Sequence, residues 1–139
     1  MFYVFDTNIC RLAIEKHPSV VKHIEALSAG DRVCTTLISF GESVGGWLPL
    51  CRRADNGEER AHYYGLLYAV FNFYRGMVCL PFDDGAAVIF NQLRAQKVRV
   101  KTNDLSIAAI TLSVNGILVT RNTVDFERVP GLVFEDWAK

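Results

Sequence analysis

The sequence predicts an α/β fold around a mainly parallel sheet. Short apolar runs of strand length alternate along the chain with longer segments of helical pattern, an order typical of β-α-β units. The runs are apolar throughout, as expected of strands that helices cover on both faces. The length of 139 residues fits one domain, and we expect a single domain over residues 1–139.

The first elements are a strand and two helices. Residues 1–5, "MFYVF", predict a buried strand that ends in the polar turn "DTN". A helix should start near Ile9 and reach about Lys16. "HPSVVKHIEALSAGD" predicts a second helix, with Pro18 near its first position and Gly30 at its end.

The middle of the chain predicts one strand and two further helices. "RVCTTL" is typical of a strand, and "SFGESVGGWLPL" should begin as a helix that weakens at Gly45 and Gly46. Residues 51–57 predict a loop. A long helix should then run from Glu58 to about Arg75, apolar on most of its later surface.

The last third repeats the alternation. "MVCLPF" predicts a strand and "DDGAAVIFNQLRAQKV" a helix with an acidic first turn. A helix that opens at Asp104 should end at the capping pair Asn115-Gly116. "ILVT" predicts a buried strand, 121–131 a loop, and "LVFEDW" a last strand.

The composition excludes several classes of protein. Half of the residues are hydrophobic and 12% are aromatic, which excludes a disordered chain. The net charge is zero, so any contact with nucleic acid must come from a local patch. We expect reduced, buried thiols at the cysteines, because no two form a C-x-x-C pair. No signal peptide is visible, and the longest apolar run, 66–71, is too short for a membrane span, so we expect a cytoplasmic protein without membrane contact.

Carboxylate and amide side chains follow several of the expected strands or open helices: Asp6, Glu42, Asp104, Asn122 and Asp125. The carboxyl ends of parallel strands meet at one edge of a sheet, so these side chains are candidates for one catalytic site. Each also has a local explanation. Asp6 can cap a helix, Glu42 completes a capping box with Ser39, Asp104 suits a helix dipole, and Asp125 can be a solvated loop residue.

A cluster of carboxylates points to metal chemistry. Like charges at one site repel, and a hard cation relieves the repulsion. Oxygen donors without histidine or cysteine favour Mg²⁺, with Mn²⁺ as the alternative. Hydrolysis of a phosphodiester is the reaction that most often needs such a site.

A short basic run precedes Asp104. In strand-like alternation, Lys97, Arg99 and Lys101 would share one side and hold a phosphate backbone near the acids, and Arg121 is a further candidate for binding nucleic acid. The alternative for this run is a solvated loop.

Four stretches resemble the PIN-domain ribonucleases, and within them the VapC-type toxins of bacterial toxin–antitoxin pairs. They are "FDTNI", "TTLISFGE", "TNDLSIAA" and "LVTRNTVDFERVPGL". The resemblance implies a three-layer α/β/α sandwich and metal-dependent endoribonuclease activity on structured RNA such as tRNA or rRNA. It also implies a homodimer and a small cognate antitoxin.

The resemblance also implies roles for individual residues. Asp6 and Asp104 would be the main Mg²⁺ ligands, and Glu42 would complete the acidic triad. Thr7 and Asn8 would orient Asp6 through hydrogen bonds. Two features depart from the family pattern. Many PIN domains carry an aspartate where this chain has Asn122, a neutral ligand, and Asp125 is the alternative fourth residue. Relatives often have glycine or proline before Asp104, where this chain has "VKT".

Three other functions fit part of the sequence. A PIN-like binding module could have lost catalysis, and Asn122 is the residue that favours it. A phosphatase with an aspartyl intermediate would usually need a second aspartate where Asn8 stands. A metal-free nuclease would need a pair of histidines, and His17, His23 and His62 belong to no motif.

The aromatic helix expected between 58 and 75 raises a further question. Core packing explains part of its aromatic surface, and a dimer face or an antitoxin groove would explain the rest. The residues concerned are Tyr63, Tyr64, Tyr68, Phe71, Phe73 and Tyr74.

Overall fold

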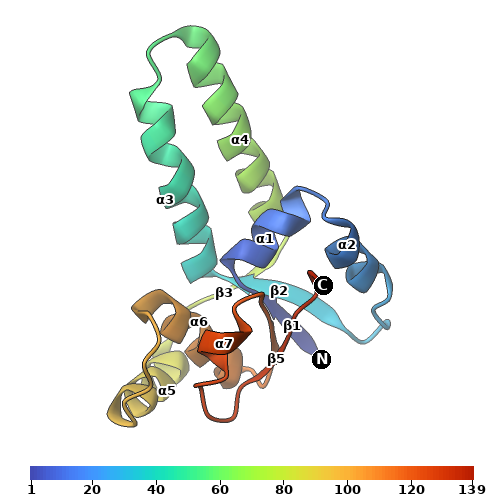
Figure 1. The fold of residues 1–139 in the computed structure, drawn as a ribbon, viewed down its shortest axis with the longest axis vertical. Helices are drawn as coiled ribbons and strands as arrows, with labels where there is room; N and C mark the ends of the chain where they lie inside the picture. Colours follow the sequence, from blue (N-terminus) through green and yellow to red (C-terminus); the bar gives the residue numbers. More distant parts are fainter.

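The computed structural model describes all 139 residues and has one five-stranded, fully parallel sheet in the order β3-β2-β1-β4-β5 (Figure 1). This confirms the expected α/β fold. The elements in chain order are β1 Phe2–Phe5, α1 Thr7–Ile14, α2 Pro18–Glu25, β2 Arg32–Thr36, α3 Leu37–Arg53, α4 Gly57–Arg75, β3 Val78–Leu80, α5 Asp84–Ala95, α6 Thr102–Ser113, β4 Ile117–Val119, α7 Thr123–Phe126 and β5 Val133–Glu135.

The sheet has an apolar core on each face, which gives the three-layer α/β/α sandwich. Alternate residues of a strand point to opposite faces. Val4 of β1 packs with residues of α5, α6 and α7, whereas the next residue, Phe5, packs with α1, α2 and α4. Trp137, near the C-terminus, closes the second core against Phe5. Because both faces of the sheet are packed, the residues that follow its strands are held in fixed positions.

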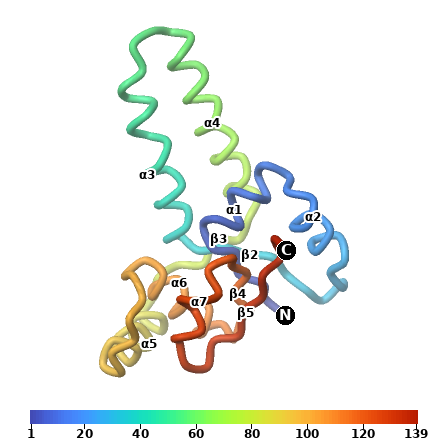
Figure 2. The backbone as a smooth tube through the Cα atoms, in the orientation of Figure 1, coloured from blue at the N-terminus to red at the C-terminus, as the bar shows by residue number.

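Helices α3 and α4 form a long hairpin that projects away from the sheet (Figures 1 and 2). The expected weakening of the helix at Gly45 and Gly46 does not end it, because α3 continues through both glycines and Pro49 to Arg53. The loop expected over 51–57 is therefore limited to 54–56. Packing of α3 against α4 stabilises the helix beyond its local propensity.

Four other features differ from the sequence expectation. Helix α1 begins at Thr7, with Asp6 as its N-cap, and α6 begins at Thr102, two residues before Asp104. Residues 97–101 form no strand, since Lys97 has a φ of 58° in a turn. The loop expected over 121–131 contains the short helix α7. Polar residues at helix starts do not follow the apolar periodicity, so a prediction from that periodicity misplaces the start by a few residues.

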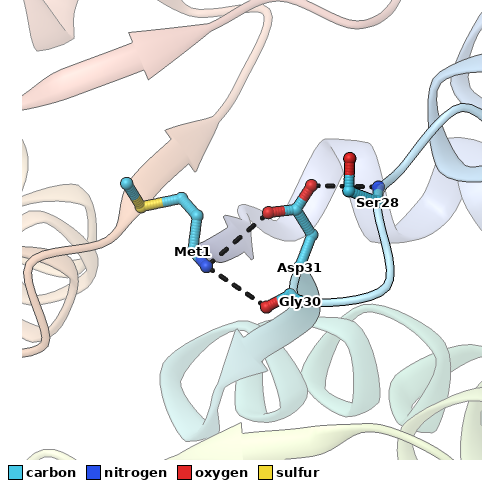
Figure 3. Close-up of polar contacts among 4 residues, drawn as sticks. All are labelled: Met1, Ser28, Gly30 and Asp31. Atoms are coloured by element: carbon cyan, nitrogen blue, oxygen red, sulfur yellow. Dashed lines mark hydrogen bonds and ion pairs between the residues drawn. The ribbon is translucent and has the colours of Figure 1, made fainter.

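The amino terminus is held against the turn before β2 (Figure 3). The Met1 ammonium lies 3.4 Å from the Gly30 carbonyl oxygen and 3.6 Å from Asp31 Oδ1. Asp31 Oδ2 accepts a hydrogen bond from the backbone N–H of Ser28 at 3.1 Å. These contacts join the start of β1 to the start of β2, where Phe2 pairs with Arg32.

The cysteines are free thiols. Cys10, Cys34 and Cys51 are buried and Cys79 is half-buried, which confirms the interpretation as core residues. None of the helices has the length and apolarity that a membrane span requires.

Candidate active site

A polar hollow of about 600 Å³ lies at the carboxyl ends of the central strands. Asp6 follows β1, Glu42 lies on α3 directly after β2, Asp104 lies in the first turn of α6, and Asn122 follows β4. The structure thus brings together four of the five expected catalytic residues. No hydrophobic residue lines the hollow, whose full lining is Asp6, Thr7, Asn8, Glu42, Lys101, Thr102, Asn103, Asp104 and Asn122.

Asp6 is held rigidly at the floor of the hollow and is only 6% exposed. Its Oδ1 accepts a hydrogen bond from the backbone N–H of Ile9 at 2.9 Å, as an N-cap does. Its Oδ2 accepts from the Thr120 hydroxyl at 2.6 Å. The partners of Asp6 are therefore Ile9 and Thr120, in place of the expected Thr7 and Asn8. Thr120 ends the apolar run "ILVT", and its polar side chain at that edge was the signal for this role.

Glu42 is exposed, and two neighbouring elements hold its carboxylate. The Thr7 hydroxyl of α1 lies 2.6 Å from Oε1, and the Asn103 amide of α6 donates to Oε2 at 3.3 Å. Ser39 does not use its hydroxyl in a capping box with Glu42: the cap of α3 is Thr36, whose hydroxyl accepts from the Ser39 N–H. Glu42 therefore has no capping role in α3, and its carboxylate is a candidate ligand in the hollow.

Two carboxylates of the hollow have raised pKa values. Burial, together with the charges of Asp104 and Glu42, raises the pKa of Asp6 to about 6, against the opposing hydrogen bonds from Thr120 and Ile9. Burial, then Glu42 and Asp125, also raise the pKa of Asp104, while Lys101 lowers it. The site therefore concentrates negative charge that a bound cation would neutralise.

Asn122 and Asp125 have different positions. Asn122 lines the hollow, and its amide nitrogen donates to Asp125 Oδ2 at 2.8 Å, which leaves its carbonyl oxygen for the hollow. Asp125 Oδ1 lies 3.7 Å from the Arg128 guanidinium, and Asp125 is absent from the lining. Of the two candidates for a fourth site residue, Asn122 is the one that lines the hollow.

The expected basic residues do not share one side. Lys101 lines the polar hollow beside Asp104. Lys97 and Arg99 line a separate hollow of about 540 Å³ together with Arg128, because the turn at Lys97 interrupts the alternation that a strand would impose. Arg121 is exposed and lines neither hollow.

The donor set of the polar hollow fits a hard divalent cation. All potential ligands are oxygen atoms, the type that Mg²⁺ and Mn²⁺ prefer, and none of the three histidines lines the hollow. The structure has no group of three or more histidine, cysteine, aspartate or glutamate side chains arranged around one metal position. Mg²⁺ does not need one, since it is usually bound through one or two carboxylates, with water and substrate phosphate as the other ligands.

A second, mostly apolar groove adjoins the polar hollow. It has a volume of about 380 Å³, lies between α1, α3 and α4, and shares Thr7, Asn8 and Glu42 with the hollow. We call it the apolar groove, and its hydrophobic residues are Ile14, Trp47, Leu50, Leu66, Ala69 and Val70.

The sequence of the whole chain has known relatives. A family model of the PIN domain matches residues 3–132. The chain belongs to the PIN domain family. It is 31% identical to the tRNA(fMet)-specific endonuclease VapC of Shigella flexneri, over 98% of both chains. It is 29% identical to ribonuclease VapC1 of Haemophilus influenzae strain R2866, over the full length of both.

Solved structures agree with this PIN fold. The chain superposes on VapBC-1 from nontypeable Haemophilus influenzae with a TM-score of 0.80 and 25% identity, over all of both chains. It superposes on VapBC2 from Rickettsia felis, bound to a DNA fragment from the promoter, with a TM-score of 0.79 and 27% identity over 99% of both chains. The family likeness therefore covers the hairpin as well as the sheet.

Proposed function

We propose that this chain is a divalent-metal-dependent endoribonuclease that acts in the cytoplasm as the toxin of a toxin–antitoxin pair. The observation that carries the proposal is the polar hollow, where a PIN domain brings Asp6, Glu42 and Asp104 together at one sheet edge. Relatives named ribonuclease VapC1 and tRNA(fMet)-specific endonuclease VapC support RNA as the substrate, and the second name supports structured RNA such as tRNA; rRNA is the other structured RNA that we propose to test.

In this proposal Asp6 and Asp104 hold Mg²⁺ or Mn²⁺, and Glu42 completes the set. A bound divalent cation would activate water and stabilise negative charge on the phosphate. The protein contributes the fixed geometry: Ile9 and Thr120 orient the Asp6 carboxylate, whose remaining lone pairs are available to the hollow. Thr7 orients Glu42 in the same way.

Lys101 is the residue best placed to hold the scissile phosphate, because its ammonium lines the same hollow as the acids. Lys97 and Arg99, with Arg128, would hold the RNA backbone further along. Arg121 remains a candidate for the flanking surface.

We propose that the apolar groove is the binding site of the antitoxin. Solved relatives are VapBC assemblies, which supports a protein partner for this chain as well. A segment with apolar side chains could bury them against Trp47 and Leu50. Because the groove shares Glu42 with the hollow, that segment would also cover the acids. We further propose a homodimer, and the exposed aromatic residues Tyr64, Tyr68 and Phe71 on α4 are candidates for its interface.

The test is cleavage of a pool of total tRNA and rRNA by purified, antitoxin-free protein. The reactions contain Mg²⁺, Mn²⁺ or EDTA, and D6N protein is the control. We expect fragments with either metal, and none with EDTA or with D6N. Cleavage that survives both EDTA and the substitution would contradict the proposed site.

The second candidate is a PIN-fold module that binds RNA or protein without cleaving. One observation favours it: Asn122 lines the hollow and supplies no charge. A folded wild-type protein that binds RNA but cuts nothing in the pool with either metal would favour this candidate.

A further inference from the structure

Tyr74 lies on the last turn of α4, at the base of the hairpin, and is 3% exposed. Its ring packs edge-to-face on Phe40 and Phe73 in the second core. Its hydroxyl leaves this apolar surrounding and reaches α3, where it lies 3.2 Å from the Ser39 carbonyl oxygen and 2.8 Å from Ser43 Oγ. One partner would satisfy a buried phenol, and this one has two on the same helix.

The direction of both hydrogen bonds follows from counting protons. A carbonyl oxygen only accepts, so Tyr74 donates its single hydroxyl proton to Ser39, and the Ser43 hydroxyl donates to Tyr74. Ser39 and Ser43 are one helical turn apart, and Glu42 lies on the turn between them. Tyr74 therefore clamps the turn of α3 that carries Glu42.

Ser39 also connects this clamp to the Glu42 carboxylate by a second route. Its hydroxyl, fully buried, lies 3.1 Å from the Thr7 hydroxyl. The Thr7 hydroxyl, which donates to Glu42 Oε1 at 2.6 Å, is also the donor that faces Ser39 Oγ, so one hydroxyl touches both residues of α3. This route consists of the short side chains of Ser39 and Thr7, which have few rotamers to lose.

We propose that Tyr74 is a positioning residue for Glu42. Its hydroxyl fixes the first two turns of α3 against the base of α4, while Thr7 joins the same turns to α1, and so the Glu42 carboxylate stays within the polar hollow. Glu42 needs such support because it is exposed and has no ion-pair partner, and an exposed glutamate otherwise samples many rotamers. The inference rests on the proposed function, since it concerns the carboxylate proposed to complete the metal site.

The test is a double-mutant cycle on wild type, Y74F, E42Q and the double variant. Two quantities are measured: Mn²⁺ affinity from the electron paramagnetic resonance signal of free Mn²⁺, and the single-turnover rate of RNA cleavage. We expect Y74F to weaken Mn²⁺ binding and slow cleavage about 10-fold, the scale of lost support for a metal ligand. In the E42Q background, Y74F should have no further effect on either quantity. RNA affinity in EDTA should stay unchanged.

The matched control is T111V. It also removes a buried hydroxyl that donates to a backbone carbonyl, that of Ile107 at 2.8 Å, but on α6 and away from Glu42. We expect T111V to keep both the Mn²⁺ affinity and the cleavage rate of wild type. Urea unfolding of each variant shows whether stability alone has changed.

Three results would overturn the positioning role: no effect of Y74F, an equal effect of Y74F with and without Glu42, or an equal loss in T111V. A coupled loss of Mn²⁺ affinity in a protein that cuts no RNA would support the positioning role and contradict the proposed function. A wild type that neither binds Mn²⁺ nor cuts RNA would contradict both.

Discussion

The polar hollow and the apolar groove share one wall and have opposite linings. Thr7, Asn8 and Glu42 belong to both. On one side of this wall no residue is hydrophobic, and burial with the charges of Asp104 and Glu42 raises the pKa of Asp6. On the other side most of the contact surface is apolar, contributed by residues such as Trp47 and Leu50. The comparison teaches that two adjacent sites can share a wall and still suit different ligands: the hollow suits charged groups, and the groove suits apolar side chains.

The largest expected effect follows from changing the carboxylates of the polar hollow. D6N or D104N should lower the cleavage rate by at least about 100-fold, the scale of losing one strong electrostatic contact with the reacting group. Neither change should prevent folding, because asparagine has the same shape. Cleavage is measured at saturating Mg²⁺. The control is D55N, the same chemical change at an exposed residue between α3 and α4, and it should cut like wild type. A D104N protein with full activity would contradict the role of Asp104.

The second-largest effect follows from placing a charge in the apolar groove. L50K places a charge in the apolar groove and should weaken inhibition by the cognate antitoxin about 30-fold, as expected of a buried contact residue. Cleavage without antitoxin should stay unchanged, because Leu50 is absent from the polar hollow. Inhibition is measured as the antitoxin concentration that halves the rate. V88K, at an exposed valine of α5 outside the groove, is the control. If L50K is inhibited as well as V88K, the antitoxin binds elsewhere.

A third effect concerns the stability of the metal-free protein. The raised pKa of Asp6, about 6 against an ordinary value of 3.8, means that the folded state binds a proton more tightly than the unfolded state. Asp6 therefore contributes most stability below pH 4, and that contribution is lost as the pH rises to 6 and beyond. At pH 7.5 in EDTA, D6N should raise the free energy of unfolding by on the order of 1 kcal/mol, the charge relief being partly offset by a lost hydrogen bond.

Urea unfolding of wild type and D6N at pH 7.5 and pH 4 checks this effect. The advantage of D6N should shrink at pH 4, where the wild-type carboxyl is protonated in the folded state. Saturating Mg²⁺ should also reduce the advantage, because the cation stabilises only the wild type. A D6N protein that is less stable than wild type at pH 7.5 would show that the two hydrogen bonds of Asp6 outweigh its desolvation.

Sequence reasoning reached the acids more easily than the residues that hold them. Asp6, Glu42 and Asp104 each mark the end of a strand or the start of a helix, and parallel topology brings such positions together. The polar end of the run "ILVT" places Thr120 at the same edge, but its bond to Asp6, like the bond of Asn103 to Glu42, depends on side-chain directions that no local pattern encodes. The hairpin shows the same limit, because α3 passes Gly45, Gly46 and Pro49 only with α4 packed beside it.

The smallest expected effect separates the two basic regions. In the wild type, the charge of Lys101 lines the polar hollow and lowers the pKa of Asp104. K101Q removes this charge, so RNA affinity should fall several-fold. The slope of log affinity against log salt concentration should fall by about one. K97Q, in the hollow with Arg99 and Arg128, should change affinity less for a short RNA than for a long one, because it lies outside the acidic site. Fluorescence anisotropy in EDTA with labelled RNAs of two lengths measures both. Equal effects of the two substitutions on the short RNA would indicate one continuous basic surface, and would restore the common role that the sequence suggested for these lysines.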